Sequence, residues 1–72
     1  MSRHELRQAR YTEVAGLIQD YVKLNHFSPT VRELARSAGV SPSTMLYTLN
    51  EMEEKGFISR LPSCPRSIVV LE

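Results

Sequence analysis

The sequence predicts a mainly helical α+β domain in which three helices precede a C-terminal β-hairpin. Three observations support this fold class. Apolar residues up to Gly56 recur at helical spacings, capping residues and glycines divide that stretch into three segments, and the period changes after Gly56. We expect helices over about 2–25, 30–37 and 41–55 and a hairpin over about 57–71. A chain of 72 residues is expected to form one domain, 1–72.

The first segment has the features of one long amphipathic helix. Ser2 followed by Glu5 fits a capping box, in which each side chain satisfies a free amide at the helix start. Spacings of three and four place five apolar side chains on one face: Val14, Leu17, Ile18, Tyr21 and Val22. Pro29 forces the residue before it into an extended conformation, so we expect the helix to end near 25–26.

Two shorter capped segments follow, with a tight turn between them. Thr30 and Glu33 form another capping box, and Gly39 is placed to end this helix in a left-handed conformation. Ser41 is a good N-cap for the next helix, and Pro42 suits its first position, where no amide donor is needed. Two capped helices joined by a glycine turn are typical of a helix-turn-helix unit.

The last part of the chain completes a winged helix-turn-helix. The third helix carries an apolar stripe and is expected to end at Gly56; the stripe is Met45, Leu49 and Met52. Residues 57–61 and 66–71 read as two short strands, the second rich in β-branched residues. The segment 62–65 contains two prolines and predicts the turn of the hairpin, or wing.

The third helix is the candidate reader of double-stranded DNA. An α-helix fits the major groove, where the N-terminal residues of a recognition helix meet base edges. We expect its exposed face to carry Ser43, Thr44, Tyr47 and Thr48, with Thr44 and Tyr47 as the main base contacts. Asn50 is expected to reach the DNA backbone, and Arg60 and Arg66 of the wing to contact phosphate or the minor groove. The alternative for Tyr47 and Leu46 is that they cover the core or contact a protein partner.

Composition excludes several other classes of function. The net charge is only +1, which is weak support for nucleic-acid binding, although arginines cluster near the start of the chain at Arg3, Arg7 and Arg10. No catalytic set or phosphate-cradling glycine loop is present, so we expect no enzyme, cofactor or small-molecule substrate. Cys64 is the only cysteine, and His4 and His26 lack partners at metal-ligand spacing, so no metal is expected. No apolar run approaches membrane length and no signal core follows Met1, which predicts a cytoplasmic protein without a membrane partner.

The ordered set of these motifs resembles the N-terminal DNA-binding domain of LexA repressors. The resemblance runs from about Arg10 to Leu71 and includes Ser28–Ala35, Gly39–Thr44, Leu49, Glu53–Ile58, Pro62 and Pro65–Ile68. It implies a winged helix-turn-helix that binds palindromic operators as a dimer and represses damage-response (SOS) genes, nucleoid-associated in a bacterial or phage system. The family's reading residues fall on Ser41, Ser43, Thr44, Leu46 and Tyr47, its early arginine on Arg10 and its wing arginine on Arg66.

Departures from the LexA pattern limit what the resemblance implies. The turn after Gly39 is one residue shorter, and Leu46 and Tyr47 replace polar readers, so we expect a non-standard operator. LexA proteins also have a C-terminal domain with a serine-lysine dyad, a self-cleavage site and the dimer interface, which these residues do not supply. The chain is therefore either an excised domain or a stand-alone relative that self-cleavage cannot induce.

Two alternatives stay open at this point. Met45–Leu49 and Pro65 also resemble the Z-alpha family, which binds left-handed DNA. That family has an asparagine where Ser43 stands and a tryptophan where Ser67 stands. The other alternative is a winged helix that contacts a regulatory protein or a second copy of itself; the low net charge, Leu46 and Tyr47 favour it.

Overall fold

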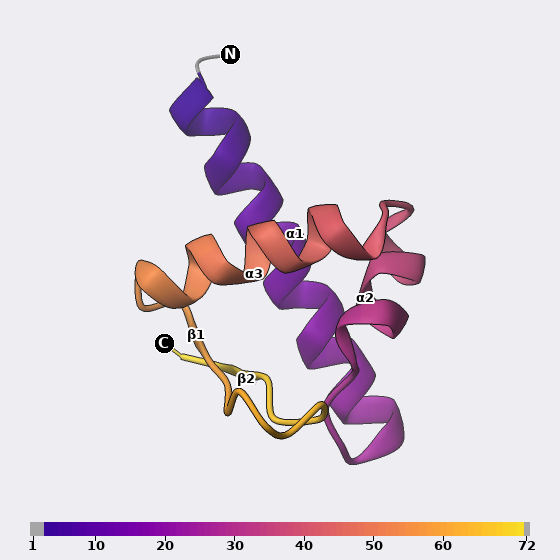
Figure 1. Cartoon of the computed structure of the whole chain (residues 1–72). Coiled ribbons are helices and arrows are strands. Elements are labelled where there is room, and N and C mark those ends of the chain that lie inside the picture. The colour runs from indigo at the N-terminus through magenta and orange to yellow at the C-terminus, as the bar shows by residue number, and fades with distance from the viewer. Residues whose placement is uncertain (1–2, 72) are drawn as a thin grey trace.

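A computed structural model describes residues 3–71 of the chain, with side chains from Gln8 onward. It contains α1 (Arg3–Asn25), α2 (Val31–Ala38), α3 (Pro42–Glu54), β1 (Ile58–Ser59) and β2 (Val69–Val70), in the expected order (Figure 1). The predicted cap of α1 by Ser2 lies outside the described residues. Within the described residues, no helix combines the length and the apolar character needed to cross a membrane.

The three helices and the hairpin enclose one apolar core. Figure 1 shows α3 crossing α1, with α2 beside one end of α3 and the hairpin beside the other. The predicted stripe of α3 is confirmed, because Met45, Leu49 and Met52 are each at most 2% exposed. The other buried core side chains come from α1, α2, β1 and the residue that precedes β2: Tyr11, Val14, Ile18, Leu34, Ala35, Ile58 and Ile68. The predicted apolar face of α1 is wrong at Val22, which is exposed and lines an open groove beside β2.

The caps that define the helix-turn-helix are confirmed. The Thr30 hydroxyl accepts from the Glu33 N–H at 3.1 Å, and Glu33 Oε1 accepts from the Thr30 N–H at 2.9 Å. Gly39 has a φ of +72°, a left-handed conformation that favours glycine, and its N–H donates to carbonyls of the last turn of α2. Ser41 Oγ then accepts from the Thr44 N–H at 3.1 Å, with Pro42 at the start of α3. These local bonds end α2 at Gly39 and start α3 after Ser41, so only a short turn separates the two helices.

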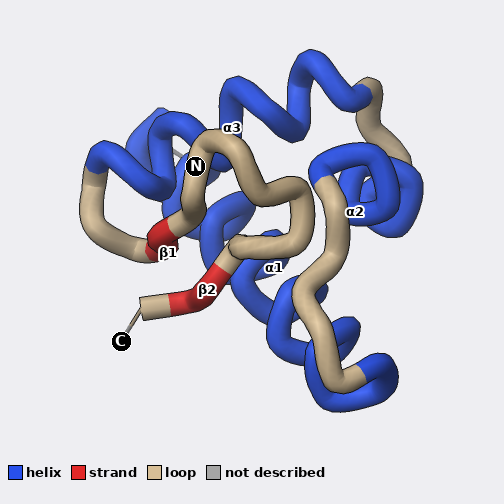
Figure 2. Tube along the Cα trace, turned by 60° about the horizontal axis from the view of Figure 1, so that its bottom comes forward, coloured by secondary structure: helices blue, strands red, loops and turns tan. Residues whose placement is uncertain are grey.

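The wing has shorter strands than the sequence predicts. β1 and β2 pair antiparallel, with Ile58 opposite Val70 and Ser59 opposite Val69. Beyond them a side chain replaces the backbone ladder: the Ser67 hydroxyl accepts from the Leu61 N–H at 2.8 Å and donates to the Cys64 carbonyl at 2.7 Å. The Leu61 N–H, which would bond across the next step of the ladder, is thus taken by the Ser67 side chain, so the ladder ends at Ser59 and Val69. The loop between the strands reaches towards the α1–α2 connection (Figures 1 and 2).

Candidate nucleic-acid interface

The N-terminal half of α3 presents an exposed face, which we call the reading face and define as Ser43, Thr44, Leu46 and Tyr47. Leu46 is 42% exposed and Tyr47 is 65% exposed, so neither belongs to the core. Their neighbour Met45 points to the opposite side of the helix and is buried. The helical period therefore places two hydroxyl and two largely apolar side chains side by side on the surface.

Thr48 corrects the prediction made for this face. It is only 3% exposed, and its hydroxyl donates to the Thr44 carbonyl at 3.1 Å. Thr48 follows Met45 by three positions and precedes Met52 by four, so the helical period places it on the buried side. The expectation that Thr48 lies on the exposed face is wrong, and we remove it from the candidate contacts.

Arg10 and the start of α3 meet at a small hollow of about 120 Å³. Arg10 and Glu13 of α1 line one side, and Val40 and Thr44 line the other. The structure thus brings together Arg10 and Thr44, which stand 34 positions apart in the sequence. An exposed guanidinium beside the N-terminus of a recognition helix is well placed for a DNA phosphate.

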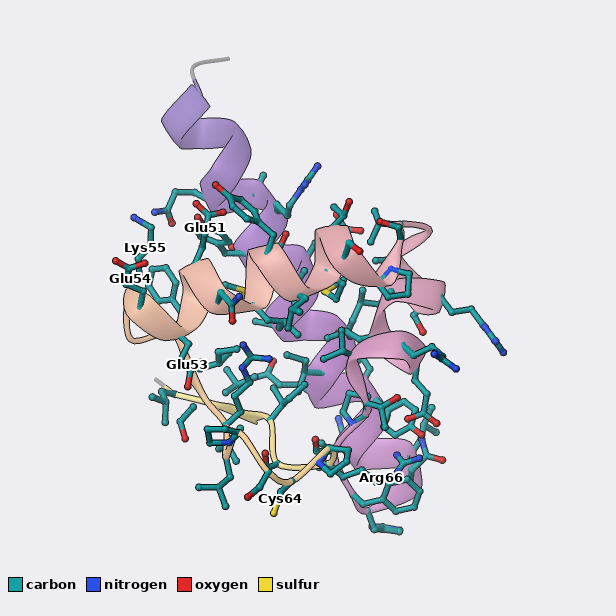
Figure 3. The ribbon with its side chains drawn as sticks, viewed as in Figure 1. Glu51, Glu53, Glu54, Lys55, Cys64 and Arg66 are labelled. Carbon is teal, nitrogen blue, oxygen red and sulfur yellow. The ribbon has the colours of Figure 1, made fainter. Side chains whose placement is uncertain are left out.

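Charge along α3 is strongly polarised. No charged residue occurs from Pro42 to Asn50, whereas Glu51, Glu53 and Glu54 gather at the other end (Figure 3). Because a phosphate backbone repels carboxylates, only the N-terminal half of α3 suits close approach to DNA. The helix dipole adds a partial positive charge at the same end.

Sequence reasoning missed two exposed arginines of α2. Arg32 and Arg36 lie on the outer side of that helix, while Leu34 and Ala35 are buried. Their spacing of four residues on a short helix, with an apolar pair between them, is the signal that would have found them. They add basic side chains to the helix that precedes α3.

Asn50 and Arg60 contact each other. The Arg60 guanidinium donates to Asn50 Oδ1, and its Nε donates to Glu53 Oε1 at 3.1 Å. The Arg60 side chain is only 18% exposed. Asn50 and Arg60 thus join the start of the wing to α3, and their contacts with the DNA backbone stay predictions.

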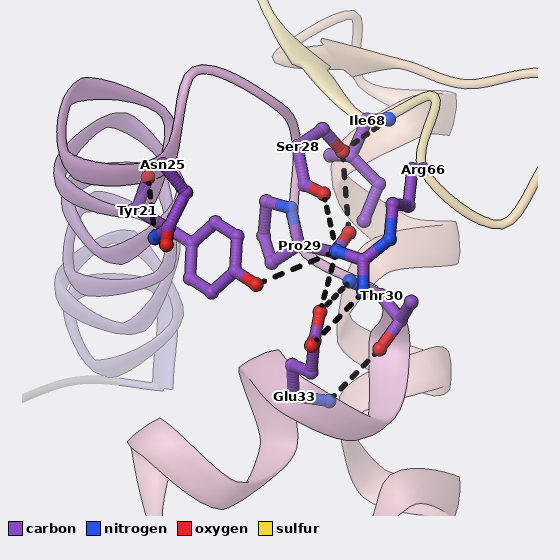
Figure 4. A network of polar contacts seen from close by, with 8 residues as sticks. All are labelled: Tyr21, Asn25, Ser28, Pro29, Thr30, Glu33, Arg66 and Ile68. Carbon is purple, nitrogen blue, oxygen red and sulfur yellow. Dashed lines mark hydrogen bonds and ion pairs between the residues drawn. The ribbon is translucent and has the colours of Figure 1, made fainter.

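Arg66 is bound from several sides at the start of α2 (Figure 4). Its guanidinium forms a bidentate pair with Glu33, at 2.8 Å to Oε1 and 3.1 Å to Oε2. It also donates to the Ser28 carbonyl at 3.1 Å and the Tyr21 hydroxyl at 3.4 Å, and lies 4.7 Å from the centre of the Phe27 ring. Hydrogen bonds from Arg66 and from the Thr30 N–H lower the pKa of Glu33 to about 2. The phosphate contact expected of Arg66 stays a prediction.

These features define a winged helix-turn-helix domain whose third helix offers an uncharged reading face. The family model for the LexA DNA binding domain matches residues 4–67. The chain belongs to this LexA DNA-binding domain family.

Curated relatives agree with this assignment. The chain is 39% identical over 64 residues to a LexA repressor of Desulforamulus reducens, a match that covers 88% of this chain and 30% of the relative. It is 43% identical over 65 residues to a LexA repressor of Corynebacterium efficiens, covering 89% of this chain and 27% of the relative. The LexA repressor of Moorella thermoacetica is 36% identical over 59 residues, which are 81% of this chain and 29% of that protein. The chain therefore spans less than a third of the length of these relatives.

Proposed function

We propose that this chain binds double-stranded DNA sequence-specifically, as the operator-reading part of a LexA-like transcriptional repressor. The observation that carries the proposal is the reading face, exposed on the uncharged N-terminal half of a capped third helix. A helix of this kind fits the major groove, where all four base pairs present distinct edges. The domain would act in the cytoplasm on bacterial or phage DNA, and its genes would be those of a damage response.

The charge pattern of α3 favours one docking orientation. The N-terminal end enters the groove, and the acidic end at Glu51–Glu54 stays away from the phosphates. Pro42 has no N–H and the Thr44 N–H is bound to Ser41 Oγ, so the Ser43 N–H is the first-turn amide left for a phosphate. Arg10, beside Thr44, is proposed to bind a phosphate next to it.

We infer from the side chains of the reading face how bases would be distinguished. Ser43 and Thr44 offer hydroxyls, which accept or donate but discriminate bases weakly. Leu46 and Tyr47 offer apolar surface, for which the thymine methyl group is the matching feature of the major groove. We therefore expect an operator half-site in which thymine methyls contribute much of the discrimination. Ser41 lies at the edge of this face and is proposed to contact the backbone.

Two domains are expected to bind together. A domain of this size binds one half-site, so useful affinity requires a second copy or a partner domain on an adjacent half-site. A homodimer on a palindrome is the arrangement that we propose. A regulatory protein partner is the alternative, and it predicts that Leu46 and Tyr47 are buried in that partner instead.

Fluorescence anisotropy tests the proposal. The chain is titrated into a duplex that it has selected from a random library and into a scrambled duplex of equal composition, each at two salt concentrations. We expect tighter binding to the selected duplex and a steep loss of affinity on both duplexes as salt rises. Equal affinity for the two duplexes would contradict sequence-specific binding. No binding to either duplex at about 10⁻⁴ M would contradict DNA binding altogether.

A further inference from the structure

We propose that Arg66 is a positioning residue, which clamps the wing to the start of α2 through Glu33 and so sets the wing relative to the reading face. The inference rests on the proposed DNA-binding function. It assigns to Arg66 a role other than the phosphate contact expected from the sequence. The clamp is defined as Tyr21, Ser28, Glu33 and Arg66.

The clamp joins three parts of the fold. Arg66 lies in the loop between the strands, 45 positions from Tyr21 of α1 and 33 positions from Glu33 of α2. Its third partner, the Ser28 carbonyl, belongs to the connection between these helices. Figure 4 shows the guanidinium of Arg66 facing all three partners. One side chain of the wing thus contacts both helices and the segment that joins them.

Glu33 transmits this contact to the helix-turn-helix. Its Oε1 accepts from the Thr30 N–H at 2.9 Å and from Arg66 at 2.8 Å, so the carboxylate that caps α2 also holds the wing. The capping box holds this carboxylate on the helix side, and the wing holds it on the other side through Arg66. A shift of the wing would therefore have to break the bidentate pair or disturb the start of α2.

A second hydrogen bond beside the clamp also attaches the wing to the α1–α2 connection. The Ser28 hydroxyl accepts from the Ile68 N–H at 3.1 Å, while the Ser28 carbonyl accepts from Arg66. Ile68 is also 3% exposed and belongs to the core. Two wing residues in close succession are thus bound to one residue of the α1–α2 connection. Together with the Arg60 contacts to α3 at the other end of the wing, these two bonds restrict the direction of the wing.

The same contacts disfavour a direct phosphate role. Both oxygens of Glu33 face the guanidinium, so a phosphate bound there would lie close to a carboxylate and be repelled by it. The low pKa of Glu33, about 2, means that this carboxylate stays ionised at any pH suited to DNA binding. A bidentate pair also requires the planar fork of arginine, whereas a lysine can replace it at a phosphate.

Four variants distinguish a positioning role of Arg66 from a phosphate contact: Glu33→Gln, Arg66→Ala, Arg66→Lys and the double variant Glu33→Gln with Arg66→Ala. Each is titrated into the selected duplex over a range of salt, with Arg10→Ala as the variant that should lose a phosphate contact. We expect each single clamp variant to weaken binding about fivefold or more, and the double variant to lose no more than either single one. The salt slope should stay unchanged in the clamp variants and fall by about one unit in Arg10→Ala.

Relaxation of ¹⁵N in the free variants gives a readout that does not depend on DNA. Residues 60–67 should become more mobile in Glu33→Gln and in Arg66→Lys, while α3 keeps the relaxation rates of the unmodified chain. Unchanged relaxation of the wing would overturn the proposal.

Two binding outcomes would also decide against the clamp, in different ways. If Glu33→Gln and Arg66→Lys bind normally while Arg66→Ala loses one unit of salt slope, Arg66 is a phosphate contact and only the positioning role fails. If the unmodified chain binds no duplex, the proposed function fails, and the positioning role fails with it.

Discussion

Replacement of Tyr47 by alanine tests the reading face most sharply, because the side chain is 65% exposed and belongs to the N-terminal half of α3. A tyrosine buries about 150–250 Å² when fully covered, so roughly 100–160 Å² of Tyr47 is available to DNA. At about 25 cal/mol per Å², covering that area contributes about 2.5–4 kcal/mol. Ordering the side chain costs about 0.5–1.5 kcal/mol, which leaves a net contribution of about 1–3.5 kcal/mol. We therefore expect Tyr47→Ala to raise the Kd for the selected duplex by about 5- to 400-fold.

The assay is fluorescence anisotropy on the selected and scrambled duplexes, accompanied by urea unfolding. Because Tyr47 is exposed and alanine is the better helix former, the stability should change by less than about 0.5 kcal/mol. Thr48→Ala is the matched control on the next position of α3: its side chain is buried, so we expect lower stability and an unchanged preference for the selected duplex. Equal losses by Tyr47→Ala on both duplexes would refute base reading, and no loss on either would remove Tyr47 from the interface.

Three further predictions follow from the core, the clamp and the reading face. Leu49 is 0% exposed, so Leu49→Ala should cost about 2–5 kcal/mol in urea unfolding, and a cost below about 1 kcal/mol would contradict its central position. The pKa of Glu33 falls from 4.5 to about 2 on folding, so its stabilising effect is complete above pH 4.5 and lost as the pH drops towards 2. The Tm advantage of the unmodified chain over Glu33→Gln should shrink across this window, and a constant advantage would refute the ion pair. Uracil in place of a contacted thymine should weaken binding by the unmodified chain about fourfold per methyl group lost, and should weaken binding by Leu46→Ala much less. Equal losses for the unmodified chain and Leu46→Ala would exclude recognition of the methyl group by Leu46.

The sequence predicts the helices and their caps because the interactions that define them are local. The capping box of Thr30 and Glu33 spans four consecutive residues. The left-handed turn at position 39 depends on one residue alone, because glycine adopts a positive φ without strain. The buried stripe of α3 follows from the helical period in the same way. Each of these features can be recognised without knowledge of any other part of the chain.

Tertiary contacts decide the features that the sequence does not predict. Thr48 has a polar side chain, yet its hydroxyl is satisfied by the Thr44 carbonyl, so the helical period can bury it at little cost. The strands end early because the Ser67 hydroxyl accepts from the Leu61 N–H and donates to the Cys64 carbonyl, so turn bonds replace the next ladder bonds. The partners of Arg66 lie 33 to 45 positions away, so composition near the wing reveals only a basic residue and not the carboxylate that binds it.

Chemical-shift mapping of the ¹⁵N-labelled chain with the selected duplex tests most directly whether the N-terminal half of α3 reads DNA. Sequence-specific docking predicts that the amides of Ser41 and of Ser43–Tyr47, together with Arg10, shift strongly with the selected duplex. They should shift much less with the scrambled one. Amides of the acidic end, Glu51–Glu54, should change little with either duplex. The largest shifts at that acidic end, or identical shifts with the two duplexes, would contradict operator reading by this helix.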